Sequence, residues 1–338
     1  MSTPELIVLR QTGLGDLVSG LPALRALRRA FPKHRMRMTC PSWLAPLATH
    51  LRVADILVTE DHGAGGPVEH ESADESMVRK ALESVRSPDV LVALRAPERD
   101  VARAVVDGRA RLVIAYRHPE IDATAPFPTF SFDDHILLRW ERLLDRFGVV
   151  SRRADLHFRL PVGAARGGRH TVIHVGAGSP ARRWPEERSS QVARALEMAG
   201  HRVLLTGSED EAALVARVRG SAGIPRDRDV SGRTDVLALA QLVSEARLVL
   251  SCDTGIAHVA IGLRVPSVIL FGAVAPGWWG APPGCLLHRS LWKGRLGEPY
   301  APQPDPGLLQ ISVAEVLETA LGAWPDAAYV CPFVAASD

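Results

Sequence analysis

The stretch that most constrains the fold is 248–272, LVLSCDTGIAHVAIGLRVPSVILFG. An apolar run stops at Asp253, Thr254 and Gly255, a short apolar segment containing His258 follows, and a second apolar run completes the stretch. This order predicts strand, turn, helix and strand, a compact βαβ unit. A strand that opens onto a helix N-terminus presents free backbone N–H groups and a partial positive charge. We therefore predict an anion-binding site at this turn.

The length of the chain indicates more than one domain. A chain of 338 residues is too long for one comfortable hydrophobic core. A fresh strand begins near Thr171 after an arginine- and glycine-rich linker at 151–169. We therefore predict an N-terminal domain at 1–165 and a C-terminal domain at 166–338, with the last helix or tail a candidate for packing back on the N-terminal domain.

The amino-acid composition limits which binding partners and which cellular location we expect. The hydrophobic fraction of 46% and the charged fraction of 23% are those of an ordinary soluble protein, and a net charge of +2 gives no reason to expect nucleic acid as a partner. No apolar run approaches the ~20 residues that span a bilayer, and the N-terminus shows no signal peptide. The four cysteines are scattered and match no metal-binding spacing. We expect reduced cysteines and a cytoplasmic location.

Strand-like and helix-like segments alternate through the first half. This alternation predicts a mainly parallel sheet with helices on both faces. The expected strands are 5–10, 35–40, 54–59, 89–95 and 111–116, the helices begin at Ser42, within 98–108 and at 134–147, and the loops are 60–74 and 117–133.

The first strand leads into a glycine-containing turn. Gly13 and Gly15 allow a sharp turn or a close approach to a ligand, and Asp16 follows them. The Asp16 carboxylate either caps the next helix or faces a pocket. Pro22 requires that the regular helix starts near Ser19 or bends there.

The second half repeats the α/β pattern and brings three polar loops to strand ends. The expected strands are 171–175, 201–206, 248–252 and 265–271, with helices after Pro185, Gly207 and Asp235 and at 311–321. The loops 176–183, 207–211 and 253–258 follow three of these strands. In a doubly wound sheet such ends share one edge, where ligands bind. This half is therefore predicted to bind a nucleotide.

Each polar residue of these loops also has a simpler interpretation. Arg182 and Arg183 either clamp a diphosphate or are solvated surface charges. Glu211 either binds ribose hydroxyls or favours a helix dipole. Asp253 is equally an N-cap, and His258 is more often a buried core histidine than a ligand. No GxGxxG and no GxxxxGK[ST] segment is present, so neither dinucleotide nor P-loop chemistry is indicated.

Four ordered segments resemble a known family. They are LIVLRQTGLGDLVSGLPALRALRRAFP, HVGAGSPARRWPEE, LLTGSEDE and SCDTGIAHVAIGLRVPSVILFG, and the resemblance covers about residues 5–320. The sequence resembles the family 9 glycosyltransferases, the lipopolysaccharide heptosyltransferases. The resemblance implies the GT-B fold, two Rossmann-like domains facing across a cleft. It also implies an inverting, metal-independent transfer from an ADP-heptose, with no cofactor.

The same resemblance implies roles for individual residues. Asp16 matches the catalytic aspartate that takes the proton from the acceptor hydroxyl. The donor-binding positions correspond to Gly178, Ser179, Arg182, Arg183, Glu211, Asp253, Thr254, Gly255 and His258. Arginine stands at 182 where the family usually has lysine, which keeps the charge but changes its geometry. Catalysis is then predicted to require domain closure.

The acceptor is left open by two departures from the family pattern. Residues 92–98, VALRAPE, replace an Asp-x-Gln-Gly-like segment, and a proline-rich segment at 297–307 replaces a cysteine-bearing one. A lipopolysaccharide inner core is the family default, and a natural product or another glycan is the alternative. A lipid-linked acceptor implies peripheral membrane association. The acceptor-side candidates are Gly15, Arg95, Arg99, Arg117, His118 and Arg139, of which the charged members are equally surface charges.

Two other functions compete with sugar transfer. A nucleotide-sugar epimerase or hydrolase of the same fold would consume donor without any acceptor. A non-catalytic nucleotide-sugar-binding protein would bind donor and leave it intact. The sequence predicts no oligomeric state.

Overall fold

The structure is a computed structural model that describes residues 3–10, 13–60, 70–85, 88–99, 102–103, 110–160, 168 and 170–324. The chain divides into two compact units, one ending at Leu156 and the other beginning at His157. The division falls somewhat before the predicted one at residue 165. Residues after 156 already belong to the second unit, since the Phe158 N–H donates to the Gly262 carbonyl (3.0 Å).

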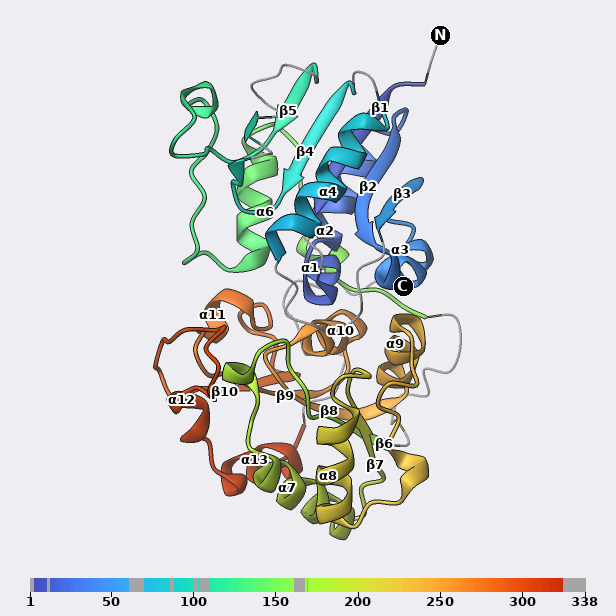
Figure 1. The fold of residues 1–338 in the computed structure, drawn as a ribbon, viewed down its shortest axis with the longest axis vertical. Coiled ribbons are helices and arrows are strands. Elements are labelled where there is room, and N and C mark those ends of the chain that lie inside the picture. The colour runs from blue at the N-terminus through green and yellow to red at the C-terminus, as the bar shows by residue number, and fades with distance from the viewer. Residues whose placement is uncertain are drawn as a thin grey trace. The chain divides into compact units, whose positions relative to one another are not determined.

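The N-terminal unit is built on a parallel sheet. Among its described residues five strands pair in the order β3-β2-β1-β4-β5. Helices cover the sheet, with α4 against β1, β2 and β3 and with α2 beside α6 (Figure 1). Its elements are β1 Glu5–Arg10, α1 Leu14–Ser19, α2 Leu21–Ala30, β2 Arg35–Pro41, η1 Ser42–Leu44, α3 Ala45–His50, β3 Ile56–Glu60, α4 His70–Glu83, β4 Val90–Leu94, β5 Leu112–Ile114, η2 Asp122–Thr124, α6 Ile136–Asp145 and η3 Arg153–Leu156.

The segment after β1 forms two helices rather than one. Helix α1 ends at Ser19, Gly20 follows, and Pro22 lies in the first turn of α2. Proline is tolerated there because its missing N–H has no intrahelical acceptor in a first turn. The break that Pro22 demanded therefore falls at Gly20, next to the predicted position.

The predicted loop at 60–74 is partly wrong, and most of the helix predicted within 98–108 cannot be compared with the structure. The loop predicted at 60–74 is wrong over its last residues, because α4 begins at His70. Met77, Val78 and Ala81 bury one face of this helix, and the helix continues through the polar residues before them. Residues 61–69 and most of the helix predicted within 98–108 lie outside the described residues.

The C-terminal unit repeats the architecture. Within the described part of this unit, five parallel strands pair in the order β10-β9-β8-β6-β7. Helices α7, α8 and α13 pack together, and α9 packs with α10 (Figure 1). Its elements are β6 His170–His174, η4 Pro180–Arg182, α7 Glu186–Met198, β7 Val203–Thr206, α8 Ala212–Ala222, η5 Arg226–Arg228, α9 Val236–Ser244, β8 Ala246–Cys252, α10 Gly255–Leu263, β9 Ser267–Leu270, α11 Pro276–Trp279, β10 His288–Leu291, α12 Pro306–Leu309 and α13 Val313–Leu321.

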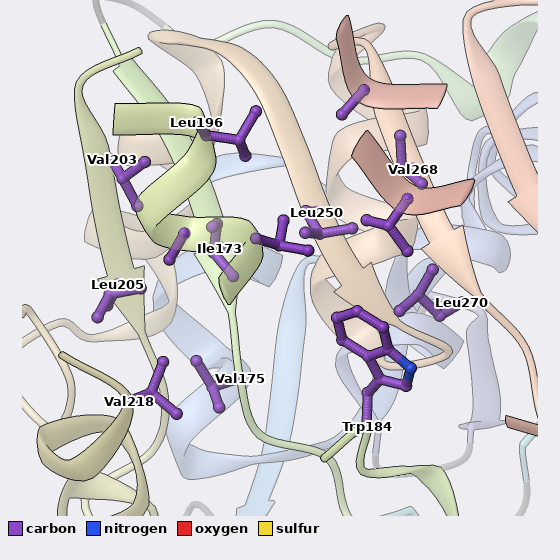
Figure 2. Close-up of a cluster of buried hydrophobic side chains, with 14 of the residues drawn as sticks. Ile173, Val175, Trp184, Leu196, Val203, Leu205, Val218, Leu250, Val268 and Leu270 are labelled. Atoms are coloured by element: carbon purple, nitrogen blue, oxygen red, sulfur yellow. The ribbon is translucent and has the colours of Figure 1, made fainter. Parts of the chain in front are cut away.

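One apolar cluster holds this unit together. Aliphatic residues from β6, β7, β8 and β9 meet residues from α7, α8 and α13, and the Trp184 ring packs at one end of the cluster (Figure 2). The Trp184 Nε1–H donates to the Ile311 carbonyl (3.2 Å), so the buried indole keeps its hydrogen bond. The Trp184 side chain thus joins the segment before α7 to Ile311, which lies in the segment before α13.

The last helix, α13, packs within the C-terminal unit. Val316 and Ala320 of α13 lie in the core of this unit, and residues 325–338 lie outside the described residues.

The cysteines are not all reduced. Cys40 and Cys252 are free thiols, whose pKa values burial raises to about 12. Cys285 is disulfide-bonded, so the expectation of four reduced cysteines is wrong at this residue.

Leu250 tests the core of the C-terminal unit. Its side chain is buried in β8, so Leu250→Ala is expected to lower the free energy of unfolding by about 2–5 kcal/mol through lost burial and a cavity. Urea unfolding followed by circular dichroism measures this change. Met198, which is 81% exposed at the end of α7, is the control, and Met198→Ala should change stability by less than about 0.5 kcal/mol. Equal effects of the two substitutions would contradict this account of the core.

Candidate functional site

The C-terminal sheet reverses its strand order between β6 and β8. The chain moves from β6 to β7 on one side and then crosses to β8, β9 and β10 on the other. The glycine turn 176–178 follows β6, and Asp253 and Thr254 follow β8. Ligands of doubly wound sheets bind outside the carboxyl ends of the strands at such a reversal. Two of the three predicted loops therefore meet where a ligand site is expected.

Arg182 joins these two loops. Its Nη1 donates to the Asp253 carbonyl (3.5 Å), and its Cζ lies 5.6 Å from the centroid of the Tyr300 ring. A Cβ on Gly178 would lie 3.2 Å from Arg182 Nη2, so glycine leaves room for the guanidinium. The buried Nε has no hydrogen-bond partner among the described residues. The guanidinium is thus held in place while part of its donor capacity is unused.

Glu211 lies in the loop after β7, and its carboxylate packs against the glycine turn that follows the neighbouring strand β6. One carboxylate oxygen accepts the Ser208 N–H (2.9 Å), and the other lies 3.6 Å from Arg183 Nη2. Arg183 Nε donates to the Ala177 carbonyl (3.1 Å). A Cβ on Gly176 would come within 1.9 Å of the Glu211 carboxylate, so only glycine fits there. The predicted loop 207–211 therefore reaches the same edge as the glycine turn.

The β8–α10 turn carries the remaining predicted donor-binding residues. Asp253 is buried, Thr254 is the N-cap of α10, Gly255 is its first residue, and His258 is buried in its first turn. The first N–H groups of a helix have no intrahelical acceptor and carry the positive end of its dipole. Burial raises the pKa of Asp253 to about 6, against the opposing effect of the Arg182 charge. This turn thus combines open N–H donors with a carboxylate that is costly to ionise.

Ser179 has a structural partner that the sequence did not reveal. Its buried hydroxyl donates to the Pro299 carbonyl. The Ala181 N–H donates to the Ala301 carbonyl (3.2 Å), and the Ala181 carbonyl accepts the Asp305 N–H (3.1 Å). The segment 297–305 is therefore fastened along the glycine turn. A hydroxyl that donates can still accept, so the predicted phosphate contact of Ser179 stays a prediction.

The N-terminal sheet has its own reversal, between β1 and β4. Asp16 lies in α1 after β1, and Arg95 directly follows β4. The Asp16 side chain is 20% exposed, and its buried Oδ1 has no hydrogen-bond partner among the described residues. A Cβ on Gly13 would lie 2.7 Å from Asp16 Oδ2, so glycine keeps space beside the carboxylate. Gly13, rather than Asp16, is the N-cap of α1, which removes the capping interpretation of Asp16.

The acceptor-side candidates differ in burial and in their local contacts. Arg95 is buried and pairs with Glu98, while Arg99 and Arg117 are exposed. The buried His118 ring accepts the Glu120 N–H at Nδ1 (3.2 Å). These contacts are local, and none of them links one candidate to another.

The Arg139 side chain bonds to the backbone of the loop that precedes α6. Its guanidinium donates to the Phe132 carbonyl (2.5 Å) and to the Asp134 carbonyl (2.9 Å). Burial lowers its pKa. These contacts give Arg139 a structural role in shaping the segment before α6.

Two residues of the sites escaped the sequence analysis. Arg10, the last residue of β1, is buried with its guanidinium against the backbone of Asp16. Tyr300 is 68% exposed beside Arg182. An arginine at the inner end of an apolar strand is a signal for Arg10, since a buried charge needs partners. Tyr300 carries no such signal, because long-range loop packing places it.

Among the described residues, no group of three or more His, Cys, Asp or Glu side chains is arranged to hold a metal ion. Within the same part of the chain, we find no helix with the length and hydrophobicity needed to cross a bilayer.

Comparisons with known proteins agree with this geometry. Residues 152–289 match the model of glycosyltransferase family 9 (heptosyltransferase). Lipooligosaccharide heptosyltransferase 2 of Haemophilus ducreyi is 22% identical over 322 residues, covering 87% of this chain and 92% of that protein.

Solved structures show a similar fold. The glycosyl transferase family 9 from Veillonella parvula has a TM-score of 0.74 at 21% identity, covering 95% of this chain and 97% of that one. Escherichia coli heptosyltransferase WaaC with ADP-2-deoxy-2-fluoro heptose has a TM-score of 0.63 at 18% identity, covering 93% and 97%.

These findings identify the fold and point to one family. Two doubly wound α/β units with structural relatives of this kind have the GT-B fold, as predicted. The match of residues 152–289 to the family 9 model and the similarity to a heptosyltransferase over most of the chain support the predicted family and enzyme class.

The raised pKa of Asp253 predicts a pH-dependent effect of Asp253→Asn. The folded state binds a proton at Asp253 more tightly, since the pKa is about 6 instead of 3.8. That contribution to stability is complete below about pH 4 and is lost as the pH rises through about 6. Asparagine avoids the ionisation and keeps the backbone carbonyl that Arg182 contacts.

Asp253→Asn should therefore be more stable than the parent at pH 8, by on the order of 2 kcal/mol, and equally stable at pH 4. Urea unfolding at the two pH values measures this. The exposed Asp227→Asn is the control and should change stability little at either pH. A gain for Asp253→Asn of the same size at both pH values would contradict the ionisation argument.

Proposed function

We propose that the protein transfers a heptose, with inversion and without a metal ion, from an ADP-heptose to a hydroxyl of a glycan or natural-product acceptor. The observation that carries the proposal is the meeting of Arg182 with the start of α10. Arg182 donates to the carbonyl of Asp253, two residues before α10 begins. An arginine with an unused donor and a helix N-terminus together suit a diphosphate.

The donor is proposed from the relatives and from the chemistry of the site. WaaC, a structural relative, has been solved with ADP-2-deoxy-2-fluoro heptose. In this chain, Glu211 offers carboxylate oxygens for ribose hydroxyls, and Asp253 offers them for sugar hydroxyls, since carboxylates accept such bonds. Arg182 and α10 then bind the diphosphate between them.

In the proposed reaction Asp16 acts as the general base. Its carboxylate takes the proton from the acceptor hydroxyl while that oxygen attacks the anomeric carbon. The bond from the anomeric carbon to the ADP oxygen breaks on the opposite face, which inverts the configuration. The Asp16 side chain is 20% exposed, which leaves part of it accessible to an acceptor.

The departing ADP gains negative charge as its bond to the sugar breaks. Arg182, Arg183 and the first N–H groups of α10 meet this charge, so stabilisation is electrostatic and needs no metal ion. Asp16 and Arg182 belong to different units. The proposal therefore requires the two units to bring both substrates together.

Asp16→Ala tests the base. The variant is expected to bind ADP with unchanged affinity and to lose at least about 100-fold in kcat, because no group remains to take the proton. Transfer from ADP-heptose is measured with a panel of lipopolysaccharide inner-core oligosaccharides and hydroxylated small molecules. Normal turnover by the variant would reject the assignment. Donor consumption by the parent protein without any acceptor would favour a hydrolase or epimerase instead.

A donor panel tests the substrate class. ADP-, GDP-, UDP- and dTDP-sugars are compared by thermal shift, because a ligand that binds only the native state raises the apparent stability. The ADP-sugar is expected to give the largest shift, and Arg182→Ala should weaken ADP binding at least about tenfold by removing a charged donor. Transfer activity should persist in EDTA. A preference for GDP or UDP, or unchanged ADP affinity in the variant, would overturn the corresponding part of the proposal.

A further inference from the structure

We propose that Arg10 is a positioning residue that holds Asp16 in place for proton transfer. The inference rests on the proposed function, in which Asp16 is the base. Arg10 is the last residue of β1, and Asp16 follows in α1.

The contacts of Arg10 converge on the backbone that carries Asp16. Its Nε (3.1 Å) and its Nη2 both donate to the Asp16 carbonyl. The Nη1 donates to the Leu94 carbonyl at the end of β4 (2.5 Å), and Nη2 also reaches Ser19 Oγ (3.4 Å). One planar guanidinium thus ties α1 to the two strands that flank the sheet reversal. A planar fork fixes an angle as well as a distance, which a flexible ammonium does not.

The guanidinium is itself locked. It is 1% exposed, and its Cζ lies 4.8 Å from the centroid of the Trp140 ring. A Cβ on Gly20 would lie 2.7 Å from Arg10 Nε, so the space for the guanidinium exists because residue 20 is glycine. Because the side chain is almost fully enclosed, it holds the groups to which it donates in a fixed position.

Arg10 supplies charge beside Asp16 without occupying its carboxylate. Arg10 Nη2 lies 3.8 Å from Asp16 Oδ1, too far for a hydrogen bond. Its hydrogen bonds go to the backbone carbonyl instead. Burial lowers the pKa of Arg10 to about 10, so the group is still charged at neutral pH. The arrangement fixes the backbone of the base while no hydrogen bond from Arg10 occupies its carboxylate.

Substitutions of Arg10 separate positioning from general stability. Arg10→Met removes both the fork and the charge, and Arg10→Lys keeps the charge but not the fork. Arg25→Met is the matched control, because half-buried Arg25 also donates to a backbone carbonyl of this unit, that of Asp155 (2.6 Å). Kinetics are measured with ADP-heptose and the acceptor that turns over fastest in the panel described above. Thermal unfolding is recorded for every variant.

We expect kcat to fall about 100-fold in Arg10→Met and about tenfold in Arg10→Lys, the partial rescue that a retained charge gives. The KM for ADP-heptose and the affinity for ADP should change less than about twofold, since their proposed ligands lie in the C-terminal unit. Arg25→Met should keep its kcat even where it unfolds at a lower temperature. In an Asp16→Ala background, Arg10→Met should cause no further loss, because Arg10 acts through Asp16.

Gly20→Ala provides an independent route to the same question. Its backbone conformation is an ordinary helical one, so alanine is allowed, but the new Cβ would lie 2.7 Å from Arg10 Nε and 3.0 Å from the Asp16 carbonyl oxygen, so it must displace the guanidinium from that carbonyl. We expect at least a tenfold loss of kcat with intact ADP binding. Gly220→Ala, whose Cβ meets nothing within 4 Å, is the control and should be fully active. If the Arg10 variants do not fold, full activity in Gly20→Ala would overturn the positioning role.

The outcomes distinguish this inference from the proposed function. Full activity in folded Arg10→Lys and Gly20→Ala, with Asp16→Ala inactive, would overturn the positioning role alone. A further loss from Arg10→Met in the Asp16→Ala background would also overturn it. An active Asp16→Ala variant would overturn the base assignment, whatever the Arg10 variants do.

Discussion

Burial of the parallel sheets on both faces is the constraint on which the rest of the structure depends. The side chains of Leu6, Ile7, Val8 and Leu9 in β1 are fully buried, so neither face of this strand has room for a reactive group. Polar function moves to the carboxyl ends of the strands. Each sheet reverses its order once, and at that reversal the loops from two strands diverge and leave space between them. Asp16 and Arg182 both follow strands that border such a reversal.

Charges at these strand ends are buried and must therefore be compensated. Removing an ion from water costs several kcal/mol unless other groups replace its hydration. In the N-terminal unit, the guanidiniums of Arg10 and Arg139 are solvated by backbone carbonyls and aromatic rings. In the C-terminal unit, the carboxylate of Asp253 lacks such full compensation, and its pKa rises to about 6. Compensation by the backbone fixes a charge in one orientation, whereas incomplete compensation leaves it ready to interact with a ligand.

Local sequence signals were sufficient for most of the fold. Apolar runs predicted the central strands, Gly200 with its positive φ ended α7, and Asp235 capped α9 through the Ala238 N–H. The polar helix α4 and the short strand β10 were missed, because a few buried residues and distant partners stabilise them rather than a strong period. Boundaries shifted by a residue or two where tertiary packing overrode local preference.

The sites followed a similar rule. Loops at strand ends were predictable, since the topology determines which ends lie together. The contacts made by Ser179 and Arg139 were not, because both bond to backbone carbonyls whose positions depend on the tertiary fold. Arg10 is different, because its role is predictable from the sequence: an arginine that ends a buried apolar strand is a buried charge in need of partners.

The segment 297–305 has a consequence for diversification of the enzyme. The Gly297 N–H donates to the Ala273 carbonyl (2.9 Å), and Asp305 both bonds to Ala181 and caps α12 through the Gly307 N–H (2.7 Å). The segment is therefore closed at its two ends by contacts that do not involve the side chains between them, and Tyr300 lies in that interval beside Arg182. The side chains in this interval are therefore free to vary without loss of the contacts that hold the segment. Side chains in this interval can be replaced while the backbone carbonyls of Pro299 and Ala301 keep their bonds to Ser179 and Ala181, so it is the natural place to change a substrate preference.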